Sequence, residues 1–374
     1  MATAYSFVGL CSGAGGLDLG FELSGFEHRV SMDLETFAID TLRRNRPCWN
    51  IEVADLRDFC LPKATSPDII LAGVPCQGFS LGGNRVEADP RNQLYTHVMR
   101  IAKESRPRVV VIENVLNLRT MKCPTTGRPF AQQISRELEQ IGYSVFFDVF
   151  KMCYFGVPQT RRRFVFVAFL GNAPIGYHLP QPDKYETVIR DFLYDLSNDC
   201  GSPPDLPNHN PTWGFKSAVH VETHSTFSEH DEVMPVRFSR TASDGNPLRS
   251  FDDPFPAVDT ATVWGWAQGH VTAKRKKKDR VNGKHIRNPN ASVTLWRISA
   301  SRLRSFTDRE YARLQTFPDD WTFVGGNKRD IHKQIGNAVP VMFAQRLGKN
   351  ISHALRCLDA DHHFSDRPHQ LSLF

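Results

Sequence analysis

The sequence predicts an α/β fold, with a mostly parallel, doubly wound sheet and a second, smaller and irregular domain. Three observations favour this fold class. Apolar runs of strand length recur through the first 170 residues and end in glycine or in charged residues. The first run leads through a glycine-rich turn into an amphipathic helical stretch. This rhythm stops near residue 171, where prolines and polar residues become frequent.

The first strand and the turn after it predict a nucleoside-binding site. The run Ser6–Leu10 is followed by the glycine turn Ser12–Gly16, which brings a ligand close to backbone amides at the start of a helix. The next two predicted strands, 28–32 and 51–54, end in Asp33 and Asp55, where carboxylates can accept hydrogen bonds from ribose and adenine groups. The glycine spacing is not the dinucleotide pattern GxGxxG. These strand ends favour an adenosine-containing cofactor such as S-adenosylmethionine.

A cysteine follows the fourth predicted strand. The apolar run Asp68–Ala72 leads into Gly73–Ser80, a tight turn that contains Cys76. The carboxyl ends of strands in open α/β sheets carry the chemistry, so a thiol in this place is positioned as a nucleophile. The alternative is a buried structural cysteine, which is the commoner fate of a lone cysteine.

Two further strand ends carry charge. The run Val109–Ile112 ends in Glu113, which pairs with a substrate nitrogen or, alternatively, is an N-cap or surface acid. Arg161 and Arg163 enter the apolar run Phe164–Ala168, where arginines need polar partners. Strand alternation predicts that these two arginines share one face.

Composition excludes several classes of protein. The eight cysteines are scattered without a CxxC pair, so neither a disulfide framework nor a metal site is expected. No apolar run approaches membrane-spanning length, and no signal peptide is evident, so a soluble, cytoplasmic protein is expected. The net charge is +6, but residues 271–287 alone carry +7. This basic segment either binds phosphates or is a solvated loop.

Six short motifs follow one another along the chain: Ser12–Gly16, Pro75–Gln77, Glu113–Val115, Gln159–Arg163, Arg309–Pro318 and Gln334–Pro340. Their sequence and order resemble those of the DNA cytosine-5 methyltransferases of bacterial type. The resemblance covers about residues 5–170 and 295–355, and it implies a Rossmann-like, S-adenosylmethionine-dependent methyltransferase domain. Two positions depart from the family pattern, because Cys11 replaces an aromatic residue and Val74 replaces a proline. We expect these changes to alter cofactor affinity rather than to abolish activity.

The resemblance also implies a mechanism. Cys76 would add to C6 of a flipped-out cytosine, Glu113 would bind its N3/N4 edge, and Arg163, supported by Arg161, would hold its O2. Methyl transfer to C5 would leave S-adenosylhomocysteine as the product. The implied cofactor-binding residues are Gly13, Ala14, Gly15, Gly16, Asp33, Leu34, Asp55, Leu56, Pro75, Asn337 and Val339.

The partner implied by the resemblance is double-stranded DNA. Residues 171–300 correspond to the target-recognition region, in which Arg237, Arg240 and Arg249 are candidates to read guanine edges. Trp264, Trp266 and Gln268 would support that surface, although tryptophans are more often core residues and most arginines near DNA contact phosphate. Further expected DNA contacts are Ser80, Arg85 and Arg91 in a lid after Cys76, and Lys274, Lys276, Lys277 and Lys278 along the backbone.

The resulting organisation is a discontinuous catalytic domain. Its first part spans residues 1–170, the recognition region spans 171–300, the returning part spans 301–358, and 359–374 form a loosely ordered tail. We expect a monomer, near the bacterial nucleoid, that shares its site with a cognate restriction endonuclease without a stable complex, or acts alone. The alternatives are a tRNA cytosine-5 methyltransferase, whose Cys-Phe-Thr motif is missing here, and a non-catalytic DNA-binding relative.

Overall fold

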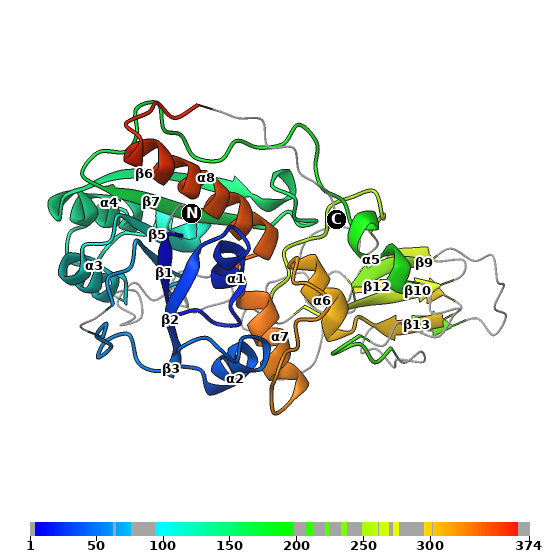
Figure 1. The fold of residues 1–374 in the computed structure, drawn as a ribbon. Helices are drawn as coiled ribbons and strands as arrows, with labels where there is room; N and C mark the ends of the chain where they lie inside the picture. Colours follow the sequence, from blue (N-terminus) through cyan, green and yellow to red (C-terminus); the bar gives the residue numbers. More distant parts are fainter. Residues whose placement is uncertain are drawn as a thin grey trace.

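The structure, a computed structural model, describes residues 4–62, 65–75, 94–197, 206–211, 221–223, 233–237, 249–260, 262–268, 272–276, 295–300 and 302–365. These residues form a larger lobe around a seven-stranded sheet and a smaller lobe of short strands beside it (Figure 1). No helix among these residues has both the length and the apolar character needed to cross a membrane.

The large sheet has the strand order β3-β2-β1-β4-β5-β7-β6. Its strands are β1 (Ser6–Leu10), β2 (Glu27–Asp33), β3 (Ile51–Val53), β4 (Ile69–Ala72), β5 (Val109–Val115), β6 (Tyr143–Lys151) and β7 (Arg162–Leu170). The first five run parallel, whereas β7 is antiparallel to both of its neighbours. The predicted doubly wound, mostly parallel sheet is therefore confirmed. Strand β6 escaped prediction because it is a half-exposed edge strand without a continuous apolar run.

Helices cover both faces of this sheet. They are α1 (Gly16–Glu22), α2 (Thr36–Asn45), α3 (Leu94–Ser105), α4 (Phe130–Gln140) and α8 (Val341–Asp359). Successive residues of a buried strand point to opposite faces. On β4, Ile70 packs in the cluster with α3 and α4, whereas Ile69 and Leu71 pack in the cluster with α1 and α8. Both faces of each central strand must therefore be apolar, which explains the uninterrupted runs in the sequence.

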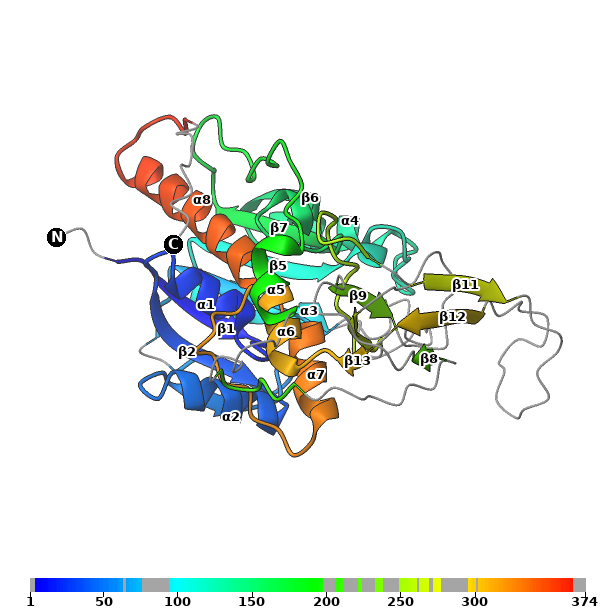
Figure 2. The ribbon, with the colours of Figure 1, turned by 90° about the vertical axis from the view of Figure 1, so that its right-hand side faces the viewer.

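The C-terminal part of the chain returns to the first β-strand unit, as predicted. The backbone of Gly16 approaches the carbonyl of Val339 so closely that a Cβ at residue 16 would come well under 3.0 Å from it. Just after the end of α1, the Ser24 hydroxyl donates to the carbonyl of Gln345 at 2.8 Å. Helices α1 and α8 lie side by side in both views (Figures 1 and 2).

The small lobe is more regular than the sequence indicates. One sheet has the order β13-β10-β9 and the other β11-β12-β8. These strands are β8 (Val221–Thr223), β9 (Val233–Arg237), β10 (Trp264–Gln268), β11 (Thr272–Lys276), β12 (Leu295–Ala300) and β13 (Arg302–Ser305). Since β13 pairs with β10, this sheet extends past the predicted boundary at residue 300. Three helices, α5 (Arg190–Ser197), α6 (Asp308–Leu314) and α7 (Lys328–Asn337), lie between the two lobes (Figure 1).

The close contact of Gly16 with Val339 can be tested by substitution. An alanine usually stabilises a helix relative to glycine by about 1 kcal/mol. At residue 16 the opposite is expected, because overpacking against a backbone carbonyl costs about 1–3 kcal/mol. Urea unfolding should show Gly16→Ala to be destabilised. The control is Gly326→Ala, whose Cβ would meet its nearest neighbour at 3.4 Å; equal stability of the two variants would contradict the prediction.

Candidate active site

The predicted cofactor residues gather at the carboxyl edge of the large sheet. The order of the strands reverses between β1 and β4, and a crevice forms at such a switch point. The amide of Gly73, after β4, donates to the carbonyl of Leu10 at 3.1 Å. The amide of Ala54, after β3, donates to the carbonyl of Asp33 at 3.0 Å. The turns after four neighbouring strands are thus side by side.

Asp33 lies at the centre of this group. Its Oδ2 accepts from the amide of Gly13 at 2.8 Å and its Oδ1 from the amide of Glu35 at 2.9 Å. Burial raises the pKa of the Asp33 carboxyl. Burial, together with the negative charges of Asp33 and Asp55, also raises the pKa of the Cys11 thiol. Each Asp33 oxygen keeps a lone pair for a further donor such as a ribose hydroxyl.

The glycines of the first turn serve two purposes. Gly13 has a φ of 55° and open space where a side chain would start, so the turn leaves room for a ligand there. Gly15, with a φ of 84°, approaches Leu42, and Gly16 approaches Val339, so both are required by packing. The sequence predicted cofactor contact for all of them, and a packing requirement supplies an independent reason for two.

The residues predicted to contact the adenine differ in their exposure. Leu34 is 62% exposed, which is unusual for a leucine at a strand end and leaves it accessible to an apolar ring. Leu56 is instead 3% exposed and belongs to the core under α3 and α4. The Asp55 carboxylate accepts from the Arg57 side chain at 2.5–3.0 Å, and this pairing lowers its pKa to about 2.

The remaining predicted cofactor residues differ in accessibility. Ala14 and Val339 are buried, Pro75 is half-buried and Asn337 is exposed at the end of α7. The structure brings Val339 to the glycine turn through its contact with Gly16.

A buried acidic residue that was not predicted lies beneath the turn. Asp18, in α1, is 1% exposed and accepts from the Ser31 hydroxyl at 2.7 Å. Burial raises the pKa of its carboxyl to about 6. It packs against Gly9, where a Cβ would come well under 3.0 Å from its carboxylate. The available signal was an acid on the apolar face of a short helix, directly after the glycines.

Glu113 and Arg163 form an ion pair at the same edge. Because β7 is antiparallel to β5, the first residues of β7 lie opposite the last residues of β5, and Arg163 pairs with Val115. The Arg163 Nε is 2.8 Å from Glu113 Oε1, and both side chains are largely buried, at 17% and 10% exposure. Among the described residues this Glu113 oxygen accepts no well-directed hydrogen bond. This oxygen therefore keeps the capacity to accept a hydrogen bond from a further donor.

The residues just before the predicted nucleophile lie next to the strand that carries Glu113. Asn114, which follows Glu113, donates from Nδ2 to the carbonyl of Val74 at 3.4 Å. Val74, which stands where the family usually has proline, is buried in the core. Cys76 itself lies outside the described residues. Its neighbours on the N-terminal side are anchored beside Glu113.

Arg161 is placed differently from the prediction. It directly precedes β7, and among the described residues its partners are not Glu113 or Arg163. Its guanidinium is 1% exposed and donates to the carbonyls of Val258 and Gly336, both at 2.9 Å, and of Ala338 at 3.1 Å. These partners of Arg161 are therefore backbone carbonyls, and Glu113 is not among them. They make Arg161 a link between segments.

Two buried glutamines complete this link. Gln159 Nε2 donates to Gln315 Oε1 at 3.0 Å, and Gln159 Oε1 accepts from the amide of Val258 at 2.9 Å. Gln315 Nε2 donates to the carbonyl of Ile335 at 2.6 Å. We call Gln159, Arg161 and Gln315 the polar joint. It ties three of the sequence motifs together through their backbones.

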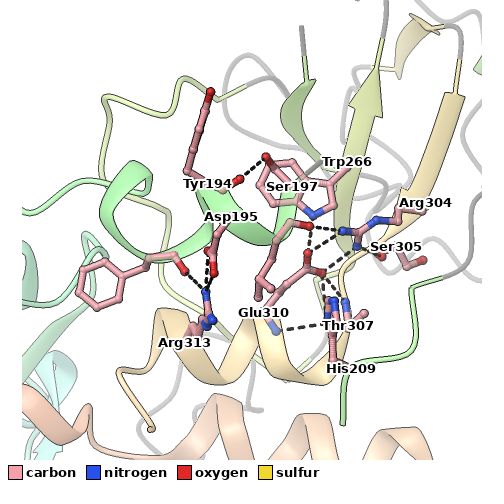
Figure 3. A network of polar contacts seen from close by, with 12 residues as sticks. Tyr194, Asp195, Ser197, His209, Trp266, Arg304, Ser305, Thr307, Glu310 and Arg313 are labelled. Atoms are coloured by element: carbon pink, nitrogen blue, oxygen red, sulfur yellow. Dashed lines mark hydrogen bonds and ion pairs between the residues drawn. The ribbon is translucent and has the colours of Figure 1, made fainter. Parts of the chain in front are cut away.

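A second buried network holds the small lobe (Figure 3). The Arg304 guanidinium, at the end of β13, pairs with both oxygens of Glu310, at 2.8 and 2.9 Å, and both side chains are fully buried. Glu310 also accepts from Trp266 Nε1 at 2.6 Å and closes a capping box with Thr307 at the start of α6. The motif Arg309–Pro318 is thus structural in this region.

The predicted DNA-reading residues are only partly described. Arg237 and Arg249 are half-buried, and each guanidinium lies 5.9 Å from the ring centre of Trp264. Trp264 and Trp266 are core residues, as the alternative interpretation held, and Gln268 is also buried. Lys274 and Lys276 lie in strand β11. Outside the described residues lie Ser80, Arg85, Arg91, Arg240, Lys277 and Lys278.

Comparison with known proteins decides the family. The family model described as C-5 cytosine-specific DNA methylase matches residues 5–353. The chain belongs to this family. It is accordingly an S-adenosylmethionine-dependent DNA cytosine methyltransferase, as the sequence predicted.

Relatives of this methyltransferase include bacterial enzymes of similar length. Type II methyltransferase M.PspPI of Psychrobacter sp. is 30% identical over 96% of this chain and 81% of its own length. Type II methyltransferase M.NgoMIV of Neisseria gonorrhoeae is 28% identical over 93% of this chain and 97% of its own length.

Two solved structures share the fold. The Entamoeba histolytica methyltransferase EhMeth has a TM-score of 0.60 at 15% identity and covers 94% of this chain and 99% of its own. The S. pombe Dnmt2 methyltransferase has a TM-score of 0.57 at 17% identity, with 95% and 99% coverage.

The buried ion pair of the small lobe predicts a large loss of stability on truncation. Arg304→Ala leaves Glu310 buried without its cation, which costs about 3–5 kcal/mol. The matched control is Arg190→Ala, because Arg190 pairs with Asp252 at the same 2.8 Å but with side chains 47% and 69% exposed. Such surface pairs contribute less than about 1 kcal/mol. Urea unfolding measures both, and similar losses for the two variants would contradict the structural role.

Proposed function

We propose that this methyltransferase acts on C5 of a cytosine flipped out of a specific duplex sequence, through a transient bond between Cys76 and C6. The observation that carries the proposal is the Glu113–Arg163 ion pair at the carboxyl edge of the sheet. The segment before Cys76 is tied to the same place by Asn114. We propose that the thiol of Cys76 acts beside this carboxylate and this guanidinium.

Each of these residues has a distinct task. Cytosine C5 is a weak nucleophile until the Cys76 thiolate adds to C6 and makes the ring electron-rich at C5. Glu113 binds the N3/N4 edge, where hydrogen bonding or proton donation draws charge from the ring. Arg163 binds O2 and stabilises the negative charge that develops there. After methyl transfer, loss of the C5 proton lets the C6–S bond break and frees Cys76.

The residues around Asp33 fit S-adenosylmethionine. Asp33 offers free lone pairs beside the open space at Gly13, and Leu34 exposes an apolar surface next to them. When bound, the cofactor supplies an electrophilic methyl group on a sulfonium. We assign Asp33 to the ribose, Leu34 to an adenine face and Asp55 to the adenine edge, whereas Leu56, which was expected to contact the adenine, is a core residue. The turn Gly13–Gly16, with Pro75, Asn337 and Val339, would surround the methionine portion.

DNA recognition is assigned to the small lobe. Arg237 and Arg249 flank Trp264 and are the described candidates for base or phosphate contacts. The lysines of β11 and beyond would follow the backbone and add salt-dependent affinity. Since the relatives are type II methyltransferases, we place the enzyme in a restriction–modification setting.

The covalent role of Cys76 is tested with one variant and one trap. Cys76→Ser should abolish methyl transfer to duplex DNA, because an alcohol is a far weaker nucleophile than a thiolate. Binding of S-adenosylmethionine, measured by titration calorimetry, should stay near the wild-type value. A duplex with 5-fluorocytosine at the target should become covalently attached to wild type alone.

Two controls accompany this test. Cys48→Ser removes an exposed thiol and should leave turnover unchanged. The same assay with tRNA as substrate separates DNA from RNA methylation. Turnover by Cys76→Ser, or failure of the wild-type enzyme to be trapped, would refute the proposed mechanism.

Glu113→Gln should impair the chemical step selectively. The amide keeps the shape of the side chain but cannot protonate the ring, so kcat should fall about 10²–10⁴-fold. The KM for S-adenosylmethionine should change little, since Glu113 belongs to the base pocket. Glu104→Gln, on the exposed end of α3, is the control. A kcat for Glu113→Gln equal to that of this control would remove Glu113 from the mechanism.

A further inference from the structure

We propose that residues 116–129, between β5 and α4, form a phosphate-binding surface for duplex DNA that is separate from the small lobe. We call these residues the β5–α4 segment. The inference rests on the proposed function, because it requires that a duplex lies over the pocket edge at Glu113. It assigns the DNA contact to three basic residues, Arg119, Lys122 and Arg128.

The place of the segment in the fold is the first argument. It begins three residues after Glu113, where β5 leaves the carboxyl edge of the sheet. In Figure 2, β5 points toward the side on which β11 and β12 lie, so the pocket edge and the small lobe face the same region. A base that is flipped into the pocket leaves its own flanking phosphates just outside it. Basic side chains that follow Glu113 in the chain are therefore close to that backbone.

The β5–α4 segment has an ordered backbone that is anchored in the core, which is the second argument. Leu118 is 1% exposed and Cys123 is 6% exposed, and both pack into the core under α3 and α4. The chain folds back on itself, with the amide of Cys123 donating to the carbonyl of Arg128 at 2.8 Å and the amide of Phe130 to that of Met121 at 3.0 Å. An ordered backbone lowers the entropy that its side chains lose on binding.

Charge is the third argument. The sequence contains no acidic residue from 114 to 136. Arg119, Lys122 and Arg128 are all exposed, and none forms an ion pair with a carboxylate of the described residues. Elsewhere in the large lobe some cations are paired, such as Arg57 with Asp55 and Arg100 with Glu104. A group of unpaired cations on an ordered hairpin has the chemistry that binds a phosphate backbone.

The test compares two triple variants with the same change in net charge. The first carries Arg119→Gln, Lys122→Gln and Arg128→Gln. The control carries Lys103→Gln, Lys349→Gln and Arg356→Gln, which are exposed residues of α3 and α8. Both helices end at the opposite edge of the sheet, since α3 leads into β5 and Asp359, at the end of α8, pairs with Arg108.

Binding to a fluorescent duplex is measured by anisotropy over a range of salt concentrations. Each lost phosphate contact lowers the salt slope by about 0.9, so the first variant should lose about 2–3 and bind at least about tenfold more weakly in low salt. The ratio of specific to non-specific affinity should not change, because phosphates carry no sequence. S-adenosylmethionine binding and the midpoint of urea unfolding should match wild type, which shows that the variant is folded.

The outcomes separate the two proposals. A control variant with an unchanged slope beside a flattened slope in the first variant supports the inference. If wild type methylates DNA but both variants keep the salt slope of wild type, the segment makes no phosphate contact. The inference then fails while the proposed function stands. A flattened slope in both variants reduces the effect to net charge and also overturns the inference. A wild-type protein that neither binds nor methylates duplex DNA would overturn both proposals.

Discussion

The polar joint of Gln159, Arg161 and Gln315 is the constraint on which the rest of the molecule depends. A buried guanidinium or amide is costly unless its donors find acceptors, so these side chains fix the carbonyls around them in place. The acceptors belong to the segment at Val258 and to the end of α7. From there the chain runs directly to Val339, whose carbonyl touches Gly16. The side chains of the joint thus connect the segment at Val258 to the start of α1.

The topology of the sheet explains how Glu113 and Arg163 come together. In a purely parallel sheet, the first residues of a neighbouring strand would lie at the amino edge, far from Glu113. Because β7 is antiparallel to β5, Arg163 enters the sheet at the carboxyl edge and meets Glu113. The acid and the base are therefore brought together by one reversed strand. The cofactor crevice depends instead on the switch point between β1 and β4.

Much of the candidate site was predictable from the sequence, because the carboxyl ends of parallel strands lie at the same edge of an α/β sheet. Gly13, Asp33 and Glu113 could be placed at this edge because each follows an apolar run that predicts a strand. Arg161 was expected to support Arg163 at the base, but its guanidinium donates to the backbone carbonyls of Val258, Gly336 and Ala338. Leu56 looks equivalent to Leu34 in the sequence, yet one is core and the other exposed. Burial of that kind depends on tertiary packing and has no local signal.

The small lobe presents a different physical problem, which the Arg304–Glu310 pair helps to solve. Its strands are short and its sheets have three strands each, so apolar burial alone specifies its orientation poorly. A buried ion pair adds little net stability compared with well-packed apolar residues, but it is directional. Here it joins the end of β13 to the first turn of α6 and to the indole of Trp266. Rotation of the lobe would separate these groups and leave a charge buried without a partner. The network therefore fixes the direction in which the small lobe faces the carboxyl edge of the large sheet.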